Sequence, residues 1–205
     1  MHLRIGFDDP FPPFAWLADG HPTGSLIERV AGIVAASGCT GEFVPLALER
    51  SEAALLAGEV DLLAFKAVVP ERRTVLAFSL PIESTGAALF APMGSPLAAH
   101  GDIARCAGLR IVTPARGPLT ALIGRLCPQA VVVPTEGYEE SLQAVLAGDA
   151  HAAALNVHVG AHWAGSRFPG RFAAPGDVFA QLDLAMAAAR GRGEPVLARL
   201  GMLAE

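Results

Sequence analysis

The chain has 205 residues, of which 52% are hydrophobic and 17% are charged, so it can form packed cores in one domain or in two small lobes. Its net charge of −5 and its lack of basic runs argue against nucleic acid as a partner. No apolar run reaches the roughly 18 to 20 residues that a membrane-spanning helix needs, so the sequence predicts a soluble protein.

The N-terminus bears on where the protein is located, and the cysteines and histidines bear on whether it binds a metal. Met1 leads directly into an apolar segment, without a basic region or a small-residue cleavage site. We therefore expect either a cytosolic chain or a mature form with an added methionine. The cysteines have no CxxC or CxxH spacing, and His158 and His162 lack an evident third ligand, so we expect no metal site and no cofactor.

The first half of the chain alternates predicted strands and helices. Residues 3–7 predict a strand, and the prolines within residues 8–14 predict a stiff loop after it. Helical spacing of apolar residues, with Ser51 as an N-cap, predicts two helices. We expect helices at 26–34 and 52–57 and further strands at 42–46 and 61–65, which is the start of a parallel α/β sheet.

The second half repeats this plan. A strand at 87–91 is followed by a turn-rich break at 92–96, near which we place a crossing to a second lobe. Beyond it we expect strands at 109–113, 130–133 and 152–155, helices at 119–126 and 139–147, a loop-rich stretch at 165–177, a returning strand at 182–187 and a closing helix at 195–203.

An internal repeat supports this division. The segment ALLAGEVD at 54–61 returns 90 residues later as AVLAGDAH at 144–151, and both copies run into an apolar stretch. In each copy an Ala/Leu-rich run ends at a glycine, Gly58 or Gly148, which predicts a helix closed by a left-handed residue before a buried strand. Two similar α/β halves predict a cleft between them, where a small ligand would bind.

Taken in order, these segments resemble the family 3 extracellular solute-binding proteins, the amino-acid-type periplasmic receptors of ABC transporters. The resemblance covers nearly the whole chain and rests on the order and spacing of short motifs. These are LRIGFD at 3–8, FPPF at 11–14, Gly24, LAGEVDL at 56–62, PER at 70–72, Phe78-Ser79, Pro81, GSP at 94–96, LRIV at 109–112, YEESL at 138–142 and LAG at 146–148.

The resemblance implies an α/β fold of the two-lobed, type 2 periplasmic-binding-protein class. Each lobe would be a mostly parallel sheet flanked by helices, and two crossing strands would act as a hinge. We expect lobe 1 at residues 1–88 and 182–205 and lobe 2 at 89–181. The resemblance further implies a periplasmic monomer that delivers a small ligand to the membrane permease of an ABC transporter.

Residue roles follow from the matching positions. Arg72 matches the arginine that binds the ligand carboxylate, a role suited to its planar fork of donors, although a surface salt bridge is the alternative for it or for Arg73. Phe11 matches an aromatic residue that lines the pocket, whereas Phe14 is expected to pack in the core. Asp8 ends a strand and suits either a ligand contact or a loop cap.

The chain also departs from the family pattern. Asn156 stands where amino-acid receptors carry the carboxylate that holds the ligand ammonium, and Arg116-Gly117-Pro118 replaces a loop rich in hydroxyls. Lys66 lies where small hydroxyl residues are common. If Lys66, Arg72 and Arg116 all face the cleft, the site is strongly positive and suits an anion; otherwise Lys66 and Arg116 extend to solvent.

The sequence thus predicts a non-enzymatic binding protein for a small carboxylate-bearing or otherwise anionic ligand. The expected ligand-binding residues are Asp8, Phe11, Phe65, Lys66, Arg72, Arg116, Gly117 and Asn156. Two alternatives remain open. One is a lyase of the cyclohexadienyl-dehydratase type on the same fold, with an acid or base among Asp8, Glu28, Glu83 and His158. The other is a cytosolic or sensor-linked ligand-binding domain.

Overall fold

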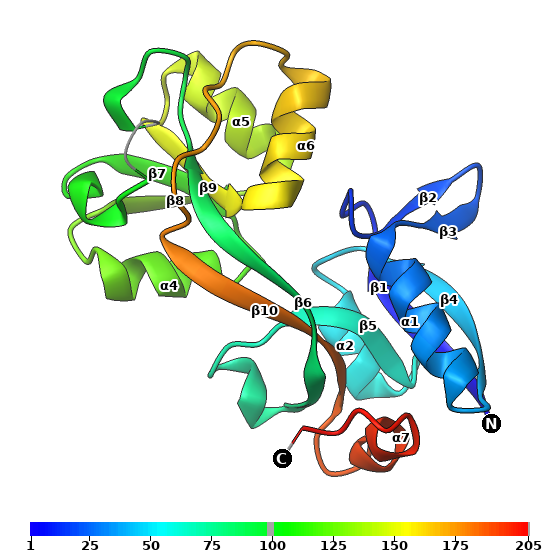
Figure 1. Ribbon diagram of the computed structural model, residues 1–205. Helices are drawn as coiled ribbons and strands as arrows, with labels where there is room; N and C mark the ends of the chain where they lie inside the picture. Colours follow the sequence, from blue (N-terminus) through cyan, green and yellow to red (C-terminus); the bar gives the residue numbers. More distant parts are fainter. Residues whose placement is uncertain (98–100, 205) are drawn as a thin grey trace. The chain divides into compact units, whose positions relative to one another are not determined.

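The chain forms two compact units, which Figure 1 shows in a computed structural model that describes residues 1–97 and 101–204. Unit 1 contains Met1–Ser84 and Asp183–Glu205, and unit 2 contains Thr85–Leu182. The chain passes between the units within two strands, β6 (Leu76–Phe90) and β10 (Ala180–Ala189). These crossings lie close to the borders expected after residues 88 and 181, whereas the turn-rich segment at 92–96 lies inside unit 2.

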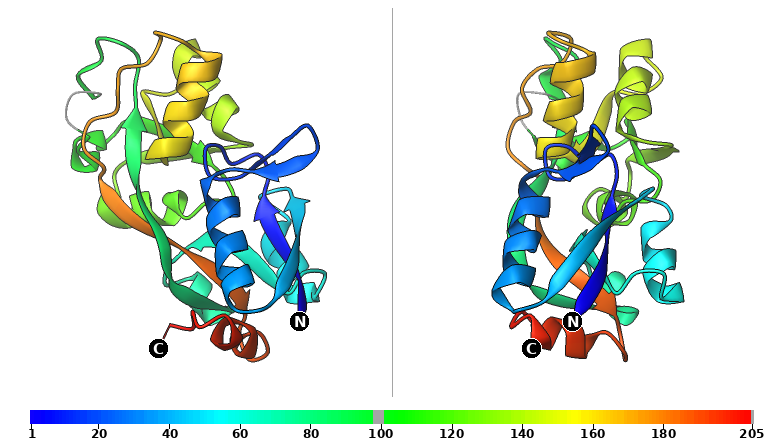
Figure 2. Two further views of the ribbon diagram at one scale, coloured as in Figure 1. Left: turned by 45° about the vertical axis from the view of Figure 1, so that its right-hand side comes forward. Right: turned by 90° about the vertical axis from the view of Figure 1, so that its right-hand side faces the viewer.

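Unit 1 is a mostly parallel sheet with a helix on each face (Figure 2). Its parallel strands are β1 (His2–Asp8), β4 (Thr40–Leu46) and β5 (Leu62–Ala67), and its main helices are α1 (Ser25–Ala36) and α2 (Ser51–Ala57). The strand order is β4-β1-β5-β10, with β10 antiparallel to β5. The unit also contains a 3-10 helix, η1 (Arg72–Thr74), and a closing helix, α7 (Glu194–Arg199).

Unit 2 has the same arrangement. Its strands are β7 (Arg110–Pro114), β8 (Val131–Thr135) and β9 (Ala152–Asn156) in the order β6-β9-β7-β8, with β6 antiparallel to β9. Its helices are η2 (Ile103–Cys106), α4 (Leu119–Leu126), α5 (Tyr138–Ala147) and α6 (Val157–Arg167). Ile111 packs in a core cluster with α4 and its neighbour Val112 in one with α5 and α6, so the helices cover both faces of the sheet.

The two units repeat one another at atomic detail. Ile5 of β1 pairs with Leu62 of β5, and Ile111 of β7 pairs with Ala152 of β9. The Arg4 backbone N–H donates to Asp61 Oδ2 at 2.7 Å and the Asp61 N–H donates to the Arg4 carbonyl at 2.8 Å. In unit 2, Arg110 donates to His151 Nδ1 at 3.0 Å and receives the His151 N–H at 2.9 Å. The predicted internal repeat is therefore confirmed as a repeated structural unit.

Both predicted glycine helix ends are confirmed. Gly58 after α2 has φ 80° and Gly148 after α5 has φ 83°, which is the left-handed region that favours glycine. The following residues close each helix in the same way, because the Glu59 N–H donates to Ala54 and the Asp149 N–H donates to Ala144. After each glycine the chain continues directly into the next strand, β5 in unit 1 and β9 in unit 2.

The structure differs from the sequence prediction at the beginning of unit 1. A hairpin of β2 (Trp16–Ala18) and β3 (His21–Thr23) lies in a segment for which no strand was predicted. Its two-residue turn consists of Asp19 and Gly20, both with positive φ, and Asp-Gly is a strong signal for such a turn. The expected N-cap role of Ser51 is wrong, since Arg50 precedes the helix and the Ser51 hydroxyl donates to the Leu48 carbonyl.

Three further element boundaries differ. Strand β6 begins at Leu76 rather than near residue 87, because it continues without interruption from unit 1 into unit 2. Helix α6 extends to Arg167, into the stretch expected to be loop-rich. The closing helix α7 ends at Arg199. Beyond it, the Met202 carbonyl accepts the backbone N–H of Leu80.

No helix in residues 1–97 and 101–204 is both long and apolar enough to cross a membrane.

Cys39, Cys106 and Cys127 are buried and free, and burial raises the pKa of Cys106 to about 11. Within the same residues, no group of three or more histidine, cysteine or acidic side chains could hold a metal ion.

Substitution of the repeated glycines tests their structural role. Gly148→Ala is expected to lower the free energy of unfolding by about 1 to 2 kcal/mol, because alanine is strained at φ 83° although no atom would crowd its Cβ. Gly58→Ala should behave similarly. Gly32→Ala is the control, since Gly32 lies inside α1 with open space around it and alanine favours helix by about 0.5 to 1 kcal/mol. Urea unfolding that shows equal stability for Gly148→Ala and wild type would contradict this account.

Candidate functional site

The candidate site residues gather where the parallel strands end. In open α/β sheets, ligands bind outside the carboxyl ends of the strands. In unit 1, Asp8 is the last residue of β1, and Phe65 and Lys66 lie near the end of β5. In unit 2, Asn156 is the last residue of β9, and Arg116 and Gly117 follow β7. We call these two groups the unit 1 site and the unit 2 site and describe each by itself.

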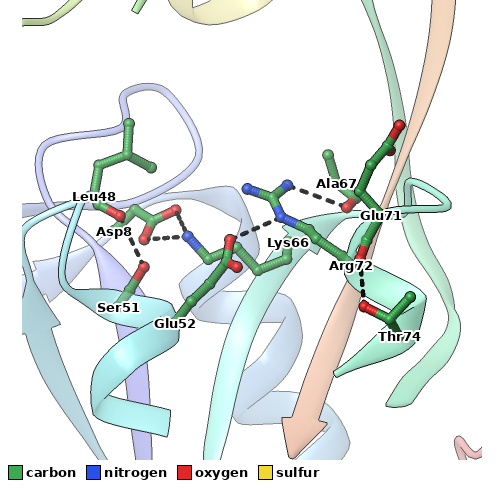
Figure 3. A network of polar contacts seen from close by, with 9 residues as sticks. All are labelled: Asp8, Leu48, Ser51, Glu52, Lys66, Ala67, Glu71, Arg72 and Thr74. Atoms are coloured by element: carbon green, nitrogen blue, oxygen red, sulfur yellow. Dashed lines mark hydrogen bonds and ion pairs between the residues drawn. The ribbon is translucent and has the colours of Figure 1, made fainter. Parts of the chain in front are cut away.

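A buried ion pair forms the centre of the unit 1 site (Figure 3). Lys66 Nζ donates to both carboxylate oxygens of Asp8 at 2.8 Å. The side chains are only 3% and 6% exposed, so Lys66 does not extend to solvent, which was the alternative considered for it. Among the described residues, no acceptor takes the third N–H of the ammonium. Asp8 is therefore a partner of Lys66 and not a free carboxylate.

Arg72 forms a second ion pair beside the first. Its Nε donates to Glu52 Oε1 at 2.8 Å, and its Nη1 donates to the Ala67 carbonyl at 3.2 Å. The guanidinium belongs to η1 and is anchored to α2 and to the end of β5 (Figure 3). The Arg72 side chain is 11% exposed, and no partner for Nη2 exists in the part of the chain that the structure describes. Arg72 is thus held in place while one edge of its guanidinium stays available.

Aromatic side chains also belong to the unit 1 site. The ring of Phe11 stacks on Phe65 at 5.4 Å between centroids and on Phe14 at 5.9 Å. Phe65 and Phe11 are 2% and 8% exposed, so both rings are buried. Phe14 is also buried, in agreement with its expected core role.

The charges of the unit 1 site cancel. Lys66 and Arg72, two of the three cations expected to make the site strongly positive, are each matched by a carboxylate, Asp8 or Glu52. The third, Arg116, lies exposed in the turn after β7, and no ion pair to it is found among residues 1–97 and 101–204. Within unit 1, a high positive charge therefore does not arise from the residues that were expected to provide it.

The unit 2 site is organised by Asn156. Its Oδ1 accepts the backbone N–H groups of His158 and Val159, at 3.1 and 3.2 Å, and so caps α6. The Thr85 hydroxyl lies 2.8 Å from His158 Nδ1 and donates to Asn156 Oδ1 at 3.4 Å. Asn156 is buried, and this helix-capping role explains an asparagine at the position.

The loop after β7 completes the unit 2 site. Gly117 is half-buried and donates its N–H to the Pro114 carbonyl at 3.3 Å. Thr113, within β7, has a fully buried hydroxyl for which the described residues provide no hydrogen-bond partner. A buried hydroxyl of this kind is costly unless some other group satisfies it.

The four acid–base candidates occupy ordinary surroundings. Asp8 is paired with Lys66, and Glu83 Oε2 lies 3.3 Å from Arg29 Nη1. Glu28 is exposed on α1, while His158 contacts Thr85. In unit 1, the three carboxylates are thus either paired with a cation or exposed on a helix.

Sequence reasoning missed three residues of these sites. Glu52 positions Arg72, Thr85 links Asn156 to His158, and Thr113 carries the buried unpaired hydroxyl. Thr113 was detectable, because it is the last residue of a predicted parallel strand. Glu52 and Thr85 were not, because their partners lie 20 or more residues away and only the fold brings them together.

Two α/β units joined by two crossing strands define the class of two-lobed, Venus-flytrap ligand-binding proteins. The chain belongs to the bacterial extracellular solute-binding proteins, family 3, which it matches over residues 3–194. This is a family of binding proteins, not of enzymes. No curated protein matches the sequence significantly.

Solved structures share the fold at low sequence identity. A histidine kinase sensor domain with similarity to periplasmic binding proteins has a TM-score of 0.87 and 22% identity, with 97% of this chain and 86% of that chain covered. Holo ArgBP from T. maritima has a TM-score of 0.82 and 16% identity, covering 97% and 87%. The B. pertussis BvgS periplasmic domain has a TM-score of 0.82 and 22% identity, covering 97% and 39%.

Neutralising one partner of the buried ion pair tests its energetic role. Asp8→Asn is expected to lower the free energy of unfolding by about 3 to 5 kcal/mol, because it leaves the buried Lys66 ammonium without a counter-ion. The double variant Asp8→Asn/Lys66→Met should lose less, since no unpaired charge remains. Chemical denaturation measures both.

The matched control is an exposed ion pair of the same unit. Arg50 and Glu59 lie 2.6 Å apart with side chains 60% and 49% exposed, so Glu59→Gln should cost less than about 1 kcal/mol. If Asp8→Asn and Glu59→Gln lowered the free energy of unfolding equally, the larger effect expected for the buried pair would be contradicted.

Proposed function

We propose that this protein captures a small carboxylate-bearing solute without chemical turnover, and that Arg72 binds the carboxylate. The observation that carries the proposal is the state of the Arg72 guanidinium. Glu52 and Ala67 hold Nε and Nη1, while Nη2 has no partner among the described residues. The remaining N–H groups of Nη1 and Nη2 form a fixed two-donor edge, which suits the two oxygens of a carboxylate.

The charge balance favours a ligand with one acidic group. Asp8, Glu52, Lys66 and Arg72 sum to zero in unit 1, so a single carboxylate on Arg72 is the anion that this site accommodates. A second acidic group would need another cation, which the residues of the unit 1 site do not supply. The solved relatives include arginine-bound ArgBP, whose ligand carries a carboxylate, which supports this class of solute.

Within this proposal the remaining expected residues have defined parts. Phe11 provides the apolar surface of the unit 1 site, backed by Phe65, while Lys66 and Asp8 form its polar end. The unit 2 site offers the side-chain amide N–H groups of Asn156, whereas the Gly117 N–H already donates to the Pro114 carbonyl.

We further propose that the protein works outside the cytoplasm, as its family name indicates, and delivers the solute to the membrane permease of an ABC transporter. A sensor role is the second candidate, favoured by the likeness to a histidine kinase sensor domain and to the BvgS periplasmic domain. Genes for a permease and an ATPase beside this gene would support transport, and a kinase gene would support sensing.

The carboxylate role of Arg72 is tested by binding. A thermal-shift screen against the amino acids, simple monocarboxylates and dicarboxylates should raise the melting temperature for at least one monocarboxylate, since a ligand of the native state stabilises it. For that compound, titration calorimetry should show an affinity loss of about 10- to 100-fold in Arg72→Ala.

Arg73→Ala is the matched control. The neighbouring guanidinium lies over the Phe78 ring at 5.9 Å, away from Glu52, so its loss should leave the affinity unchanged. Unchanged affinity in Arg72→Ala, or no response to any carboxylate in the screen, would overturn the proposal.

A further inference from the structure

Both oxygens of Asp8 are already occupied by a cation that belongs to the protein itself. Lys66 Nζ lies 2.8 Å from Oδ1 and 2.8 Å from Oδ2, and neither side chain reaches solvent appreciably. A lysine ammonium bonded to both oxygens of one carboxylate neutralises its charge, and at this depth little water competes for either partner.

Apart from Lys66, the surroundings of Asp8 have the chemistry of a cation site. Asp8 ends β1, where the parallel sheet presents ligands. A buried carboxylate at such a strand end attracts an ammonium or guanidinium group. Lys66 supplies such a group from within the chain.

The fold itself does not require this ion pair. The strand registers place Ile5 and Ile111, and Leu62 and Ala152, at equivalent positions of the two units. Counting along the strands, Asp8 corresponds to Pro114 and Lys66 corresponds to Asn156. Unit 2 thus builds the same strand ends without an ion pair.

Stability does not account for the pair either. Replacing a buried ion pair by apolar groups of similar volume is often neutral or stabilising, because both charges lose their hydration. A pair that the fold does not need and that adds little net stability is best explained by what it does to the ligand site.

We propose that Lys66 determines ligand specificity by acting as an internal counter-ion of Asp8, which excludes solutes with a cationic group at this end of the site. This inference rests on the proposed function, because it assumes that the unit 1 site binds a solute. The solute that fits wild type then has a carboxylate for Arg72 and an uncharged remainder. Removing Lys66 converts the same site into one that accepts an ammonium or guanidinium group.

The test is a gain of binding in Lys66→Ala. Propylammonium replaces the atoms that this substitution removes, and δ-aminovalerate adds a carboxylate to an ammonium. Their uncharged-end counterparts, propanol and valerate, are the controls. Lys66→Ala is expected to bind both ammonium compounds about 10- to 100-fold more tightly than wild type, while the affinity for propanol and valerate changes far less.

Further variants assign the effect to Asp8. The gain should disappear in Asp8→Asn/Lys66→Ala, because the carboxylate that would pair with the added ammonium is gone. Lys66→Met, which keeps the volume of an unbranched side chain, should show a smaller gain than Lys66→Ala for propylammonium. Calorimetry measures the affinities, and circular dichroism reports the fold.

Arg72→Ala in the Lys66→Ala background separates this inference from the proposed function. A loss of δ-aminovalerate binding with propylammonium binding retained supports both. Retention of both compounds would support the role of Lys66 and contradict the carboxylate role of Arg72.

Three results would overturn the inference. Wild type could bind the ammonium compounds as tightly as Lys66→Ala does. A folded Lys66→Ala could fail to bind them. If Lys66→Ala and Lys66→Met were unfolded, propylammonium should restore the native circular dichroism, because it would pair with Asp8, and failure to restore it would also contradict the role of Lys66.

Discussion

In our proposal, the ion pair between Asp8 and Lys66 decides what unit 1 offers to a ligand. It joins the ends of two neighbouring parallel strands, β1 and β5, and removes two charges from the position where the sheet presents ligands. The second pair continues from it, because Ala67 follows Lys66 in the chain and its carbonyl anchors Arg72. Glu52 balances the charge of Arg72, and among the described residues the N–H groups of Nη2 have no acceptor. We propose that the direction of these donors, more than a net charge, defines the site.

One repeated scaffold carries two different sites. In both units a helix closed by a left-handed glycine leads into a buried strand. The hydrogen bond from the Arg4 backbone N–H to the Asp61 side chain also recurs, as one from the Arg110 N–H to the His151 side chain. The strand ends have diverged. Unit 1 places charged pairs there, whereas unit 2 uses Asn156 to cap a helix and leaves Thr113 with an unpaired hydroxyl. The fold is thus preserved by backbone geometry, and recognition is free to change at a few positions.

Much of the fold could be predicted from local sequence signals. Apolar runs, helical spacing and the glycines at 58 and 148 are local properties, and the corresponding strands and helices are present. The hairpin around Asp19-Gly20 was also encoded locally but was overlooked, because the prolines before it indicated only a loop. The first half of strand β6 was overlooked, because Pro81 and the polar residues 83–85 interrupt its apolar run.

The candidate site was less predictable for a physical reason. Sequence identifies Lys66 and Arg72 as cations, but their effect depends on Asp8 and Glu52, which lie 58 and 20 residues away. A charge that appears free in the sequence is neutralised once the fold supplies its partner. In unit 1, Lys66 and Arg72 are therefore balanced by carboxylates, whereas Arg116 of unit 2 lies exposed in the turn after β7.

A structure of the protein bound to its best monocarboxylate tests the central claim most directly. The account predicts a ligand carboxylate within hydrogen-bond distance of the free edge of Arg72, with the Asp8–Lys66 pair intact and an uncharged part of the ligand next to it. A carboxylate bound elsewhere, or an Asp8 released from Lys66 to bind a cationic group of the ligand, would contradict it.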